Sequence, residues 1–222
     1  DDGNILIAVG NGVTGQNGNP NDTINRAVSL VKLTPQLKVI DFFTPANYEY
    51  LNSADRDYGI NGPMIIPGTT LSLSGSKDGG PYLVDNNNMG GTRTDQNDVL
   101  QRINFNAWGA PNTKALFGSP VYFRDHANKE YVYGWAQGAY LKQIHFNRQT
   151  MRLDTLNAII GTKPSTNGYL PGSILSISSN NSYEGSGILW ATNTLAGNAN
   201  HSTVRGILQA FDATDITHEL WN

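Results

Sequence analysis

The chain has 222 residues, no cysteine, 24 glycines and a net charge of -3, with only 15% charged residues. The absence of cysteine excludes structural disulfides and thiolate metal sites. The slightly acidic balance, with basic residues scattered singly, gives no electrostatic reason to expect nucleic acid as a partner. No apolar run approaches the roughly 20 residues that span a bilayer, and no signal peptide opens the chain.

Short apolar runs separated by Gly, Pro, Asn and Asp recur along the chain, a pattern that predicts strands and turns. No segment keeps the apolar spacing of a helix for three turns, so long helices are not expected. Residues 45–61 are expected to form a connection with one helical turn, and residues 11–26, 86–98 and 193–203 long surface loops. The expected strands, in chain order, lie at residues 5–10, 27–34, 37–44, 62–68, 71–75, 82–84, 99–105, 118–124, 130–135, 140–146, 151–156, 172–178, 187–192, 204–212 and 218–222.

Residues 71–85, LSLSGSKDGGPYLVD, predict a hairpin with a tight turn. Leucine alternates with serine in the first half, which is the period-two pattern of a half-buried strand. Asp78-Gly79 is the dipeptide that best tolerates the positive φ angles of a hairpin turn, and Tyr82 begins the returning strand. Asp78 is a candidate to face a ligand, but a turn role, in which its side chain bonds nearby backbone N–H groups, explains it better.

Three glycine-led restarts, at Gly62, Gly118 and Gly172, lie about 55 residues apart, a spacing typical of propeller blades and other arrays. Each restart leads to an apolar strand, a strand with small residues and a strand that ends near Asp or Asn. Four-stranded blades around an axis explain this recurrence better than a sandwich does. We therefore predict an all-β fold and a single β-propeller domain, or a partial propeller, whose four blades lie at approximately residues 1–61, 62–117, 118–171 and 172–222.

The pattern strand-G-S-x-D-G-x-x-Y-L-V-D at residues 71–85 resembles the repeat of quinoprotein-like (PQQ-type) β-propellers. The ending AFDATDITHELW resembles that family's A-x-D-x-x-T-G-x-x-W tail, although Asp215-Ile216 stands where glycine is expected and the tryptophan comes late. The chain is also similar to secreted bacterial members of this superfamily that have no assigned activity. The residues that carry the two repeat motifs are Gly75, Asp78, Gly79, Tyr82, Asp85, Ala210, Asp212, Thr214 and Trp221.

The resemblance implies an eight-bladed propeller, of which this chain supplies about half, and a secreted or cell-surface location. A closed four-bladed propeller is the alternative, because propellers have roughly 4 to 8 blades. We expect the first blade to lack its opening strand, so that the chain starts within a blade. We therefore expect residues 5–10 to leave an unpaired edge, which a second propeller half or a second copy of the chain would cover.

Motifs for catalysis are absent or weak. The serines next to glycine form no G-x-S-x-G elbow between a strand and a helix. Paired carboxylates for glycoside hydrolysis stay open, because such partners can lie far apart in sequence. The spacing of the histidines lacks the short metal-ligand pairs, which favours surface or strand-face roles over a zinc site. These histidines are His126, His145, His201 and His218.

The sequence identifies no cofactor. Asp55, Asp57 and Asn61 faintly resemble a calcium loop, but the glycine and distal glutamate of an EF-hand are missing, which favours a solvated loop. Quinone binding in the enzymatic relatives needs a tryptophan platform, an arginine and carboxylates around calcium, and the vicinal cysteines of several alcohol-oxidising relatives are absent here. Packing between blades explains the tryptophans better than a cofactor floor does. They are Trp108, Trp135, Trp190 and Trp221.

Three functions follow from these observations. The first is an extracellular β-propeller that acts as a binding or interaction module, with long Asn/Gly-rich loops presented to a glycan or a protein, since long loops in compact domains are often functional. The second is a quinoprotein-like oxidoreductase or hydrolase whose channel site is completed by a missing half. The third is a structural half-propeller that dimerises or docks on a partner.

Overall fold

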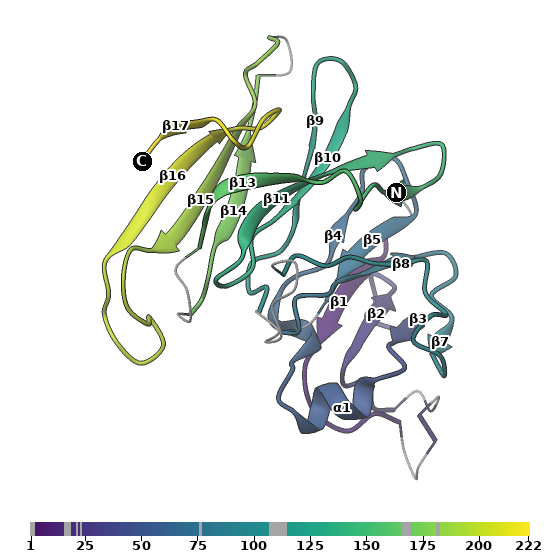
Figure 1. Cartoon of the computed structure of the whole chain (residues 1–222). Helices are drawn as coiled ribbons and strands as arrows, with labels where there is room; N and C mark the ends of the chain where they lie inside the picture. Colours follow the sequence, from purple (N-terminus) through teal and green to yellow (C-terminus); the bar gives the residue numbers. More distant parts are fainter. Residues whose placement is uncertain are drawn as a thin grey trace. The chain divides into compact units, whose positions relative to one another are not determined.

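The computed structural model describes residues 3–15, 19–20, 22, 24–75, 77–106, 115–165, 170–180 and 183–222. Strands hold 40% of the residues and helices 4%, which confirms the predicted all-β class. The strands form four sheets (Figure 1), three of four strands and one in which a fifth strand joins a row of four, consistent with the predicted propeller blades. The chain divides into two compact units, Asp1–Arg102 and Ile103–Asn222, and each unit holds two of the sheets.

The first sheet of unit 1 consists of β1 (Ile5–Val9), β2 (Ser29–Leu33), β3 (Val39–Thr44) and β7 (Gly91–Thr92), in that order. The first three strands are antiparallel, as the apolar runs and intervening turns predict. β7 pairs with β3 in the parallel direction. The first sheet therefore takes its fourth strand from a segment that follows β6 of the second sheet, which the sequence pattern did not reveal.

The second sheet of unit 1 consists of β4 (Met64–Ile65), β5 (Leu71–Ser74), β6 (Tyr82–Asp85) and β8 (Gln101–Arg102). β5 and β6 form the predicted hairpin, in the register that pairs the first residue of β5 with the last of β6. The predicted strand at residues 99–105 is reduced to the two residues of β8.

Two details of the hairpin prediction are wrong. The connection runs from residue 75 to residue 81 and is not a tight turn, because pairing stops at Ser74 and Tyr82. β5 is buried on both faces rather than half-buried. Serine is accommodated there because its small hydroxyl finds a partner: Ser72 Oγ donates a hydrogen bond of 2.7 Å to Asn86 Oδ1.

Residues 45–61 contain the one predicted helical turn, α1 (Tyr48–Ser53), and a 3-10 turn, η1 (Tyr58–Ile60). Leu51 and Tyr58 are fully buried in the core that joins the two sheets of unit 1. The sequence predicted only a connecting loop here, and its apolar side chains make this connection part of the core. The buried members of that core are Ala27, Val28, Leu30, Phe43, Leu51, Tyr58, Tyr82, Val84 and Met89.

The first sheet of unit 2 contains β9 (Val121–Arg124), β10 (Glu130–Gly134), β11 (Tyr140–Asn147) and β12 (Arg152–Leu153). β13 (Ile159–Pro164) pairs with the early part of β11, beyond the stretch that pairs with β12. β13 was not predicted. Its sequence, IIGTKP, combines an apolar start with glycine and proline, which are signals of a loop.

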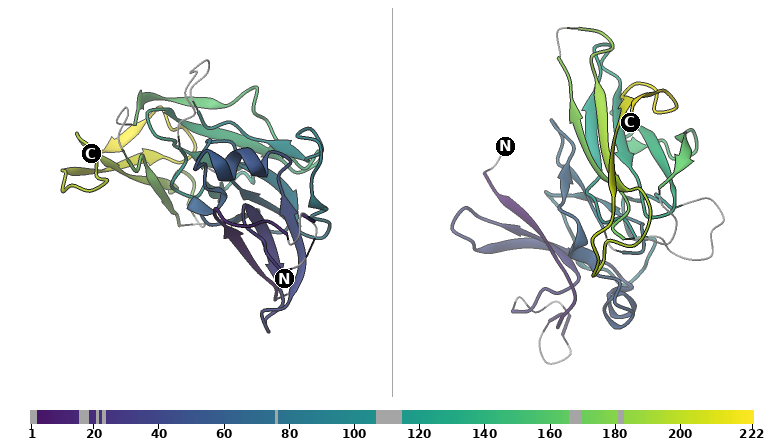
Figure 2. Two further views of the ribbon diagram at one scale, coloured as in Figure 1. Left: turned by 90° about the horizontal axis from the view of Figure 1, so that it is seen from below. Right: turned by 90° about the vertical axis from the view of Figure 1, so that its left-hand side faces the viewer.

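The second sheet of unit 2 consists of β14 (Ile174–Ser178), β15 (Ile188–Thr194), β16 (Gly206–Asp212) and β17 (Glu219–Trp221), all antiparallel and in chain order. The yellow-green strands in the right-hand view of Figure 2 show this sheet. All four strands lie within the predicted runs or extend them by at most two residues. Of the four sheets, this one follows the sequence pattern most closely.

The two sheets of unit 2 pack against each other around one core. β9 and β14, the first strands of the two sheets, are neighbours, as the inner strands of successive propeller blades are. Trp135 follows β10, is 2% exposed and meets Phe211 of β16 edge to face with the ring centroids 5.8 Å apart. This tryptophan packs between blades, as predicted. The buried members of the core are Phe123, Tyr133, Trp135, Leu141, Leu175, Leu189, Ala191, Phe211, Ala213 and Ile216.

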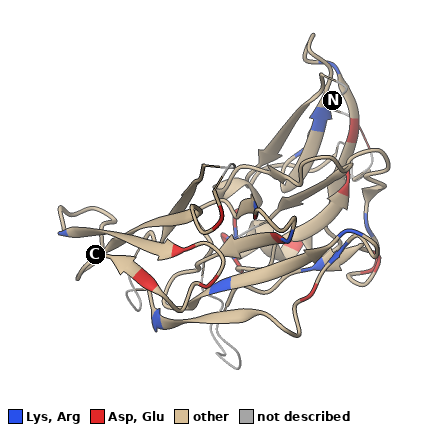
Figure 3. Cartoon of the chain, turned by 90° about the horizontal axis from the view of Figure 1, so that it is seen from above, with Lys and Arg blue, Asp and Glu red and all other residues tan. Residues whose placement is uncertain are grey.

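Charged residues of both signs are interspersed along the chain (Figure 3), in agreement with the scattered charges of the sequence. Within the described ranges, no helix has the length and apolar character needed to cross a membrane.

Gly134 in β10 is a position where a side chain is not tolerated. A Cβ atom there would lie 2.4 Å from Cδ1 of Phe105, whose ring is fully buried. We expect Gly134→Ala to lower the free energy of unfolding by about 1–3 kcal/mol, because the Phe105 ring must shift within a packed core. Denaturant titration measures the change. Gly206→Ala is the control, since its Cβ meets Asn193 O at an ordinary 3.4 Å; equal losses in the two variants would contradict the prediction.

Candidate functional site

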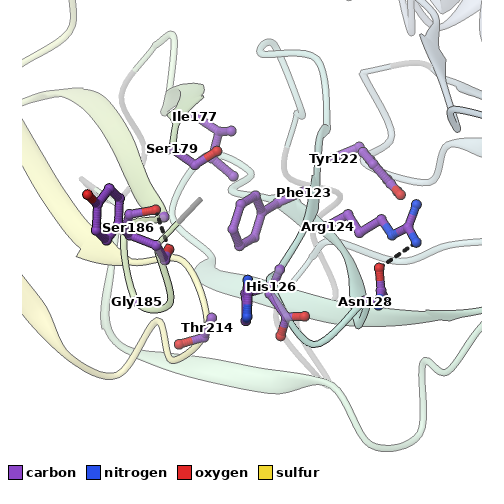
Figure 4. A pocket seen from close by; sticks show the side chains of 13 residues that line it. Tyr122, Phe123, Arg124, His126, Asn128, Ile177, Ser179, Gly185, Ser186 and Thr214 are labelled. Atoms are coloured by element: carbon purple, nitrogen blue, oxygen red, sulfur yellow. Dashed lines mark hydrogen bonds between the residues drawn. The ribbon is translucent and has the colours of Figure 1, made fainter. Parts of the chain in front are cut away.

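A pocket with a volume of about 470 Å³ lies in unit 2, among three turns at one end of its two sheets (Figure 4). The turns connect β9 to β10, β14 to β15 and β16 to β17. Pockets of a few hundred Å³ belong to the size class that encloses small ligands. Its wall includes Tyr122, Phe123, Arg124, Asp125, His126, Asn128, Tyr183, Ser186 and Thr214.

The β9–β10 turn is closed by hydrogen bonds of Asp125. The Asp125 N–H donates to Lys129 O at 2.9 Å, and the Lys129 N–H donates to Asp125 Oδ1 at 2.7 Å. Asn128 adopts φ 63°, a left-handed conformation that asparagine tolerates better than most residues. Its Oδ1 accepts a hydrogen bond from Arg124 Nη2, drawn as a dashed line in Figure 4. The polar side chains on this side of the pocket are therefore held in place.

The β14–β15 turn is organised by Ser186. Its Oγ lies 2.7 Å from Asn180 O and 2.8 Å from Tyr183 O, and it accepts the Asn180 N–H at 3.0 Å. These contacts fold the turn on itself and leave the Tyr183 side chain exposed at the pocket wall. The turn thus presents an aromatic ring from a fixed backbone.

The floor of the pocket is the ring of Phe123, which Figure 4 shows at its centre. Gly187 lies directly on this ring, because a Cβ atom at that position would be 2.5 Å from Phe123 Cζ. Any larger residue would push the β14–β15 turn away from the floor. The glycine at the start of β15 therefore sets the depth of the pocket.

Thr214, one of the predicted repeat-motif residues, lines one side of the pocket, and Asp212, another of them, holds it in place. Asp212 Oδ1 accepts hydrogen bonds from both the N–H and the Oγ1 of Thr214, each at 2.7 Å. This is the Asx turn that an Asp-x-Thr sequence favours. The motif was predicted as structural, and the structure places its Thr214 in the pocket wall as well.

The pocket is close to electrically neutral. Arg124 and Asp125 bring opposite charges to one wall, and most other lining groups are hydroxyls, amides and rings. Burial, followed by the neighbouring Glu130, raises the pKa of Tyr122. Burial, followed by Asp125, raises the pKa of Tyr131 beneath the turn. Both phenols therefore stay protonated at neutral pH and act as uncharged groups.

Among the described residues of this pocket, no hydroxyl nucleophile is hydrogen-bonded to a histidine base. His126 points into it (Figure 4) but makes no hydrogen bond to a hydroxyl within the described part of the chain. A serine nucleophile needs a base within hydrogen-bond reach. The arrangement is suited to holding a ligand through shape and hydrogen bonds.

The predicted motif residues of the hairpin make contacts that stabilise the hairpin itself. Asp78 is buried, accepts the Gly80 N–H at 3.0 Å and forms an ion pair with Arg102. Gly79 has φ 72°, as a turn glycine should, and Gly75 has no room for a Cβ, which would lie 2.6 Å from Pro81 Cα. Tyr82 is buried and donates to Asn47 Oδ1 at 3.2 Å, and Asp85 accepts the Asn87 N–H at 3.0 Å. None of the five lines the pocket of unit 2.

The remaining two motif residues lie on the last sheet. Ala210 of β16 is buried and is paired with Trp221 of β17, whose side chain is 56% exposed. Trp221 is thus on the open face of its sheet rather than between two sheets of unit 2.

The weak calcium signal at Asp55 and Asp57 has a different explanation. The Lys77 ammonium lies 3.0 Å from Asp55 Oδ2 and 2.5 Å from Asp57 Oδ2, so a cation of the chain itself balances the two carboxylates. Asn61 is buried, whereas Asp55 is exposed. Among the residues described, no three His, Asp or Glu side chains gather as metal ligands.

The described tryptophans do not fit a quinone floor. Trp135 is enclosed between two sheets and donates its Nε1–H to Ala139 O at 2.8 Å. Trp190 donates to Ser178 Oγ at 2.9 Å across the last sheet, and Trp221 is on an open face. Trp108 lies outside the described residues. No described indole therefore offers the free, enclosed ring face on which a quinone stacks.

The long loops that the sequence offered as ligand sites differ in role. Residues 45–61 and 86–98 are built into unit 1, the first through Leu51 and the second through buried Met89 and strand β7. Residues 193–203 begin with buried positions in β15. The pocket instead lies between two shorter turns that the sequence did not single out, although the polar run SSNNSYEGSG was a signal for an elaborated turn.

Comparison with known proteins adds little to this picture. No protein-family profile and no curated protein matches the chain. Among solved structures, BamB from Moraxella catarrhalis is similar over 89% of this chain, at 15% identity and a TM-score of 0.46. The alignment covers 46% of BamB, so the chain spans less than half the length of that protein. This likeness is distant, and the assignment of blades stands on the four sheets themselves.

Proposed function

We propose that the chain is an extracytoplasmic β-propeller interaction module and that the pocket of unit 2 binds a short, neutral saccharide. The observation that carries the proposal is the composition of the pocket wall. Aromatic rings (Phe123, Tyr183) stand beside neutral hydrogen-bonding groups (Asn128, Thr214) around a half-open space of about 470 Å³.

The chemistry of a sugar ring matches this wall. A pyranose has an apolar face of C–H groups, which packs on an aromatic ring, and a rim of hydroxyls that both donate and accept hydrogen bonds. Amide and hydroxyl side chains do the same, and a neutral ligand is not repelled by the opposite charges of Arg124 and Asp125. A quinone or a phosphate ester would need a concentrated positive charge that this wall lacks.

The pocket is also preorganised, which favours a binding role. Ser186, Asp125 and Asp212 each fix one of the three turns through hydrogen bonds to their own backbone neighbourhoods. Binding a ligand then costs little ordering entropy. A secreted or cell-surface location, where saccharides are abundant, belongs to the same proposal and is supported by the resemblance to secreted proteins.

We expect Tyr183→Ala to weaken saccharide binding by about tenfold, because the exposed ring supplies one wall and its loss removes roughly 1.4 kcal/mol of stacking. An array of immobilised neutral oligosaccharides, probed with labelled protein, identifies the ligand. Calorimetric titration with that oligosaccharide then measures the dissociation constant.

Tyr50→Ala is the matched control, since Tyr50 is an exposed tyrosine on α1 of the other unit. It should bind like the wild type. The proposal is wrong if no neutral oligosaccharide on the array is bound, or if Tyr183→Ala binds with unchanged affinity.

A further inference from the structure

The last sheet, β14–β17, has one face that no described element of unit 2 covers. Pairing places Ser176, Trp190, Ala210 and Trp221 in one cross-strand row, and Ile174, Thr192 and Leu208 in the next. Ile174 is 46% exposed, Leu208 41% and Trp221 56%. An apolar face of this kind marks an interaction surface. We call it the β14–β17 open face.

The preceding sheet shows what covers such a face. Each sheet of unit 2 has a row of paired residues that runs across the middle of its first three antiparallel strands. In β9–β11 this row is Tyr122–Val132–Ile144, and in β14–β16 it is Ile177–Leu189–Phe211, so we treat the two rows as equivalent. Aligning the two rows places Trp190 at the position of Tyr133 and Leu208 at that of Leu141. Tyr133 and Leu141 are fully buried, beneath the adjacent sheet. The open face is therefore a blade face whose covering sheet is outside unit 2.

The sheet face that covers its neighbour in unit 2 carries a row of apolar side chains. The row Ile177–Leu189–Phe211 packs onto the preceding sheet in the core of unit 2. A further apolar row occurs on β1–β3, where Ile7 pairs with Val31, and Val31 with Phe42. Ile7 is 39% exposed, and Ile5 on the same face is exposed as well. Val31 is only 2% exposed, and the Arg26 guanidinium lies 3.8 Å from the centre of the Phe42 ring, so Ile5 and Ile7 are the members of this face that are open to a partner.

We propose that the β14–β17 open face binds the β1–β3 face of a second copy of the chain, with the exposed Ile5 and Ile7 packed on it as the Ile177–Leu189–Phe211 row packs on the preceding sheet inside unit 2. The contact is heterologous, because the two faces differ. Two reciprocal contacts join eight sheets in a dimer, and a single contact repeated from copy to copy gives a chain of copies. The contact between copies lies outside the pocket, and its formation does not depend on a ligand in the pocket.

The test uses the full chain and a pair of charge-introducing variants. Leu208→Glu disables the open face, and Ile7→Glu disables the β1–β3 face, because each would bury an unpaired carboxylate in the contact. We expect the wild type to associate in sedimentation equilibrium and each variant alone to dissociate roughly a hundredfold more readily. Trp221→Arg repeats the test of the open face at a second, exposed position. Leu156→Glu is the control, since Leu156 is exposed on a turn and belongs to neither face.

Mixing the two variants tests whether the open face of one copy binds the β1–β3 face of another. A mixture of Leu208→Glu and Ile7→Glu retains one intact contact and should form a one-to-one complex that neither variant forms alone. Circular dichroism confirms that each variant is folded. A wild type that is monomeric at all concentrations overturns the proposal. So does an Ile7→Glu variant that associates like the wild type, because the open face would then pair with itself.

Discussion

Replacing Trp135 by alanine is expected to lower the free energy of unfolding by about 3–5 kcal/mol, the largest single effect in unit 2. The side chain is 2% exposed and meets Phe211 of the adjacent sheet edge to face. Its removal leaves a cavity between two sheets and takes away the Nε1–H donor of Ala139 O. Both losses add to the cost.

Urea denaturation followed by circular dichroism measures this effect. Tyr183→Ala is the control for loss of an aromatic ring, since Tyr183 lies on an exposed turn of the same unit, and its free energy of unfolding should change by less than about 0.5 kcal/mol. A Trp135→Ala variant as stable as the control would mean that the two sheets of unit 2 do not share the core described here.

The second large effect concerns pH and a single lysine. Lys142 of β11 is buried, and its ammonium donates hydrogen bonds to Asn104 O at 2.8 Å and Asn106 O at 2.6 Å. Burial lowers the pKa of Lys142 from 10.5 to about 8. Between these two values the unfolded chain holds the proton and the folded chain releases it. Stability therefore rises with pH in that window.

We expect the free energy of unfolding to gain about 2 kcal/mol from Lys142 between about pH 7.5 and about pH 9.5. Buried tyrosines act in the opposite direction at higher pH, because burial raises the pKa of Tyr82 to about 12 and raises that of Tyr133 as well. Their deprotonation in the unfolded chain lowers stability above about pH 10. The measurement consequently stops at about pH 9.5.

The comparison is between three proteins. Lys142→Met should lose the rise with pH, whereas Lys129→Met, at an exposed turn, should keep it. Urea titrations at several pH values give the free energies. A difference between wild type and Lys142→Met that stays constant across the window would show that Lys142 has the same pKa in the folded and unfolded chains.

The strands of the last sheet could be predicted from sequence because local signals agree there. Apolar residues in β15 and β16 alternate or run continuously between turn-forming residues, so propensity and burial favour the same structure. β13 and β7 could not be predicted in this way. Each is stabilised by pairing with a strand distant in sequence, and neither has an apolar pattern of its own.

Burial of β5 on both faces was missed for a related reason. The alternation of leucine and serine predicts one wet face, but a blade lies between two layers, and small hydroxyl side chains fit the narrow space. The sequence of β11 does contain a signal for a buried lysine. The alternation of Lys142, Ile144 and Phe146 places the lysine on an apolar face, which predicts a buried ammonium.

The pocket could not be read from the sequence, because its two main turns are more than fifty residues apart and meet only when β9 lies beside β14. Asp212 and Thr214 were recognised as motif residues, but their position at a pocket follows from packing alone. Phe123 and Gly187 show the same dependence, since the glycine has meaning only once the ring beneath it is known.

The most direct test of a saccharide site in this pocket is to map amide chemical shifts while the oligosaccharide selected on the array is added. The account predicts that the shifted signals belong to the three turns, at Asn128, Tyr183, Ser186 and Thr214, with little change in unit 1. Shifts concentrated in unit 1 or on the β14–β17 open face, with the signals of the three turns unmoved, would contradict it.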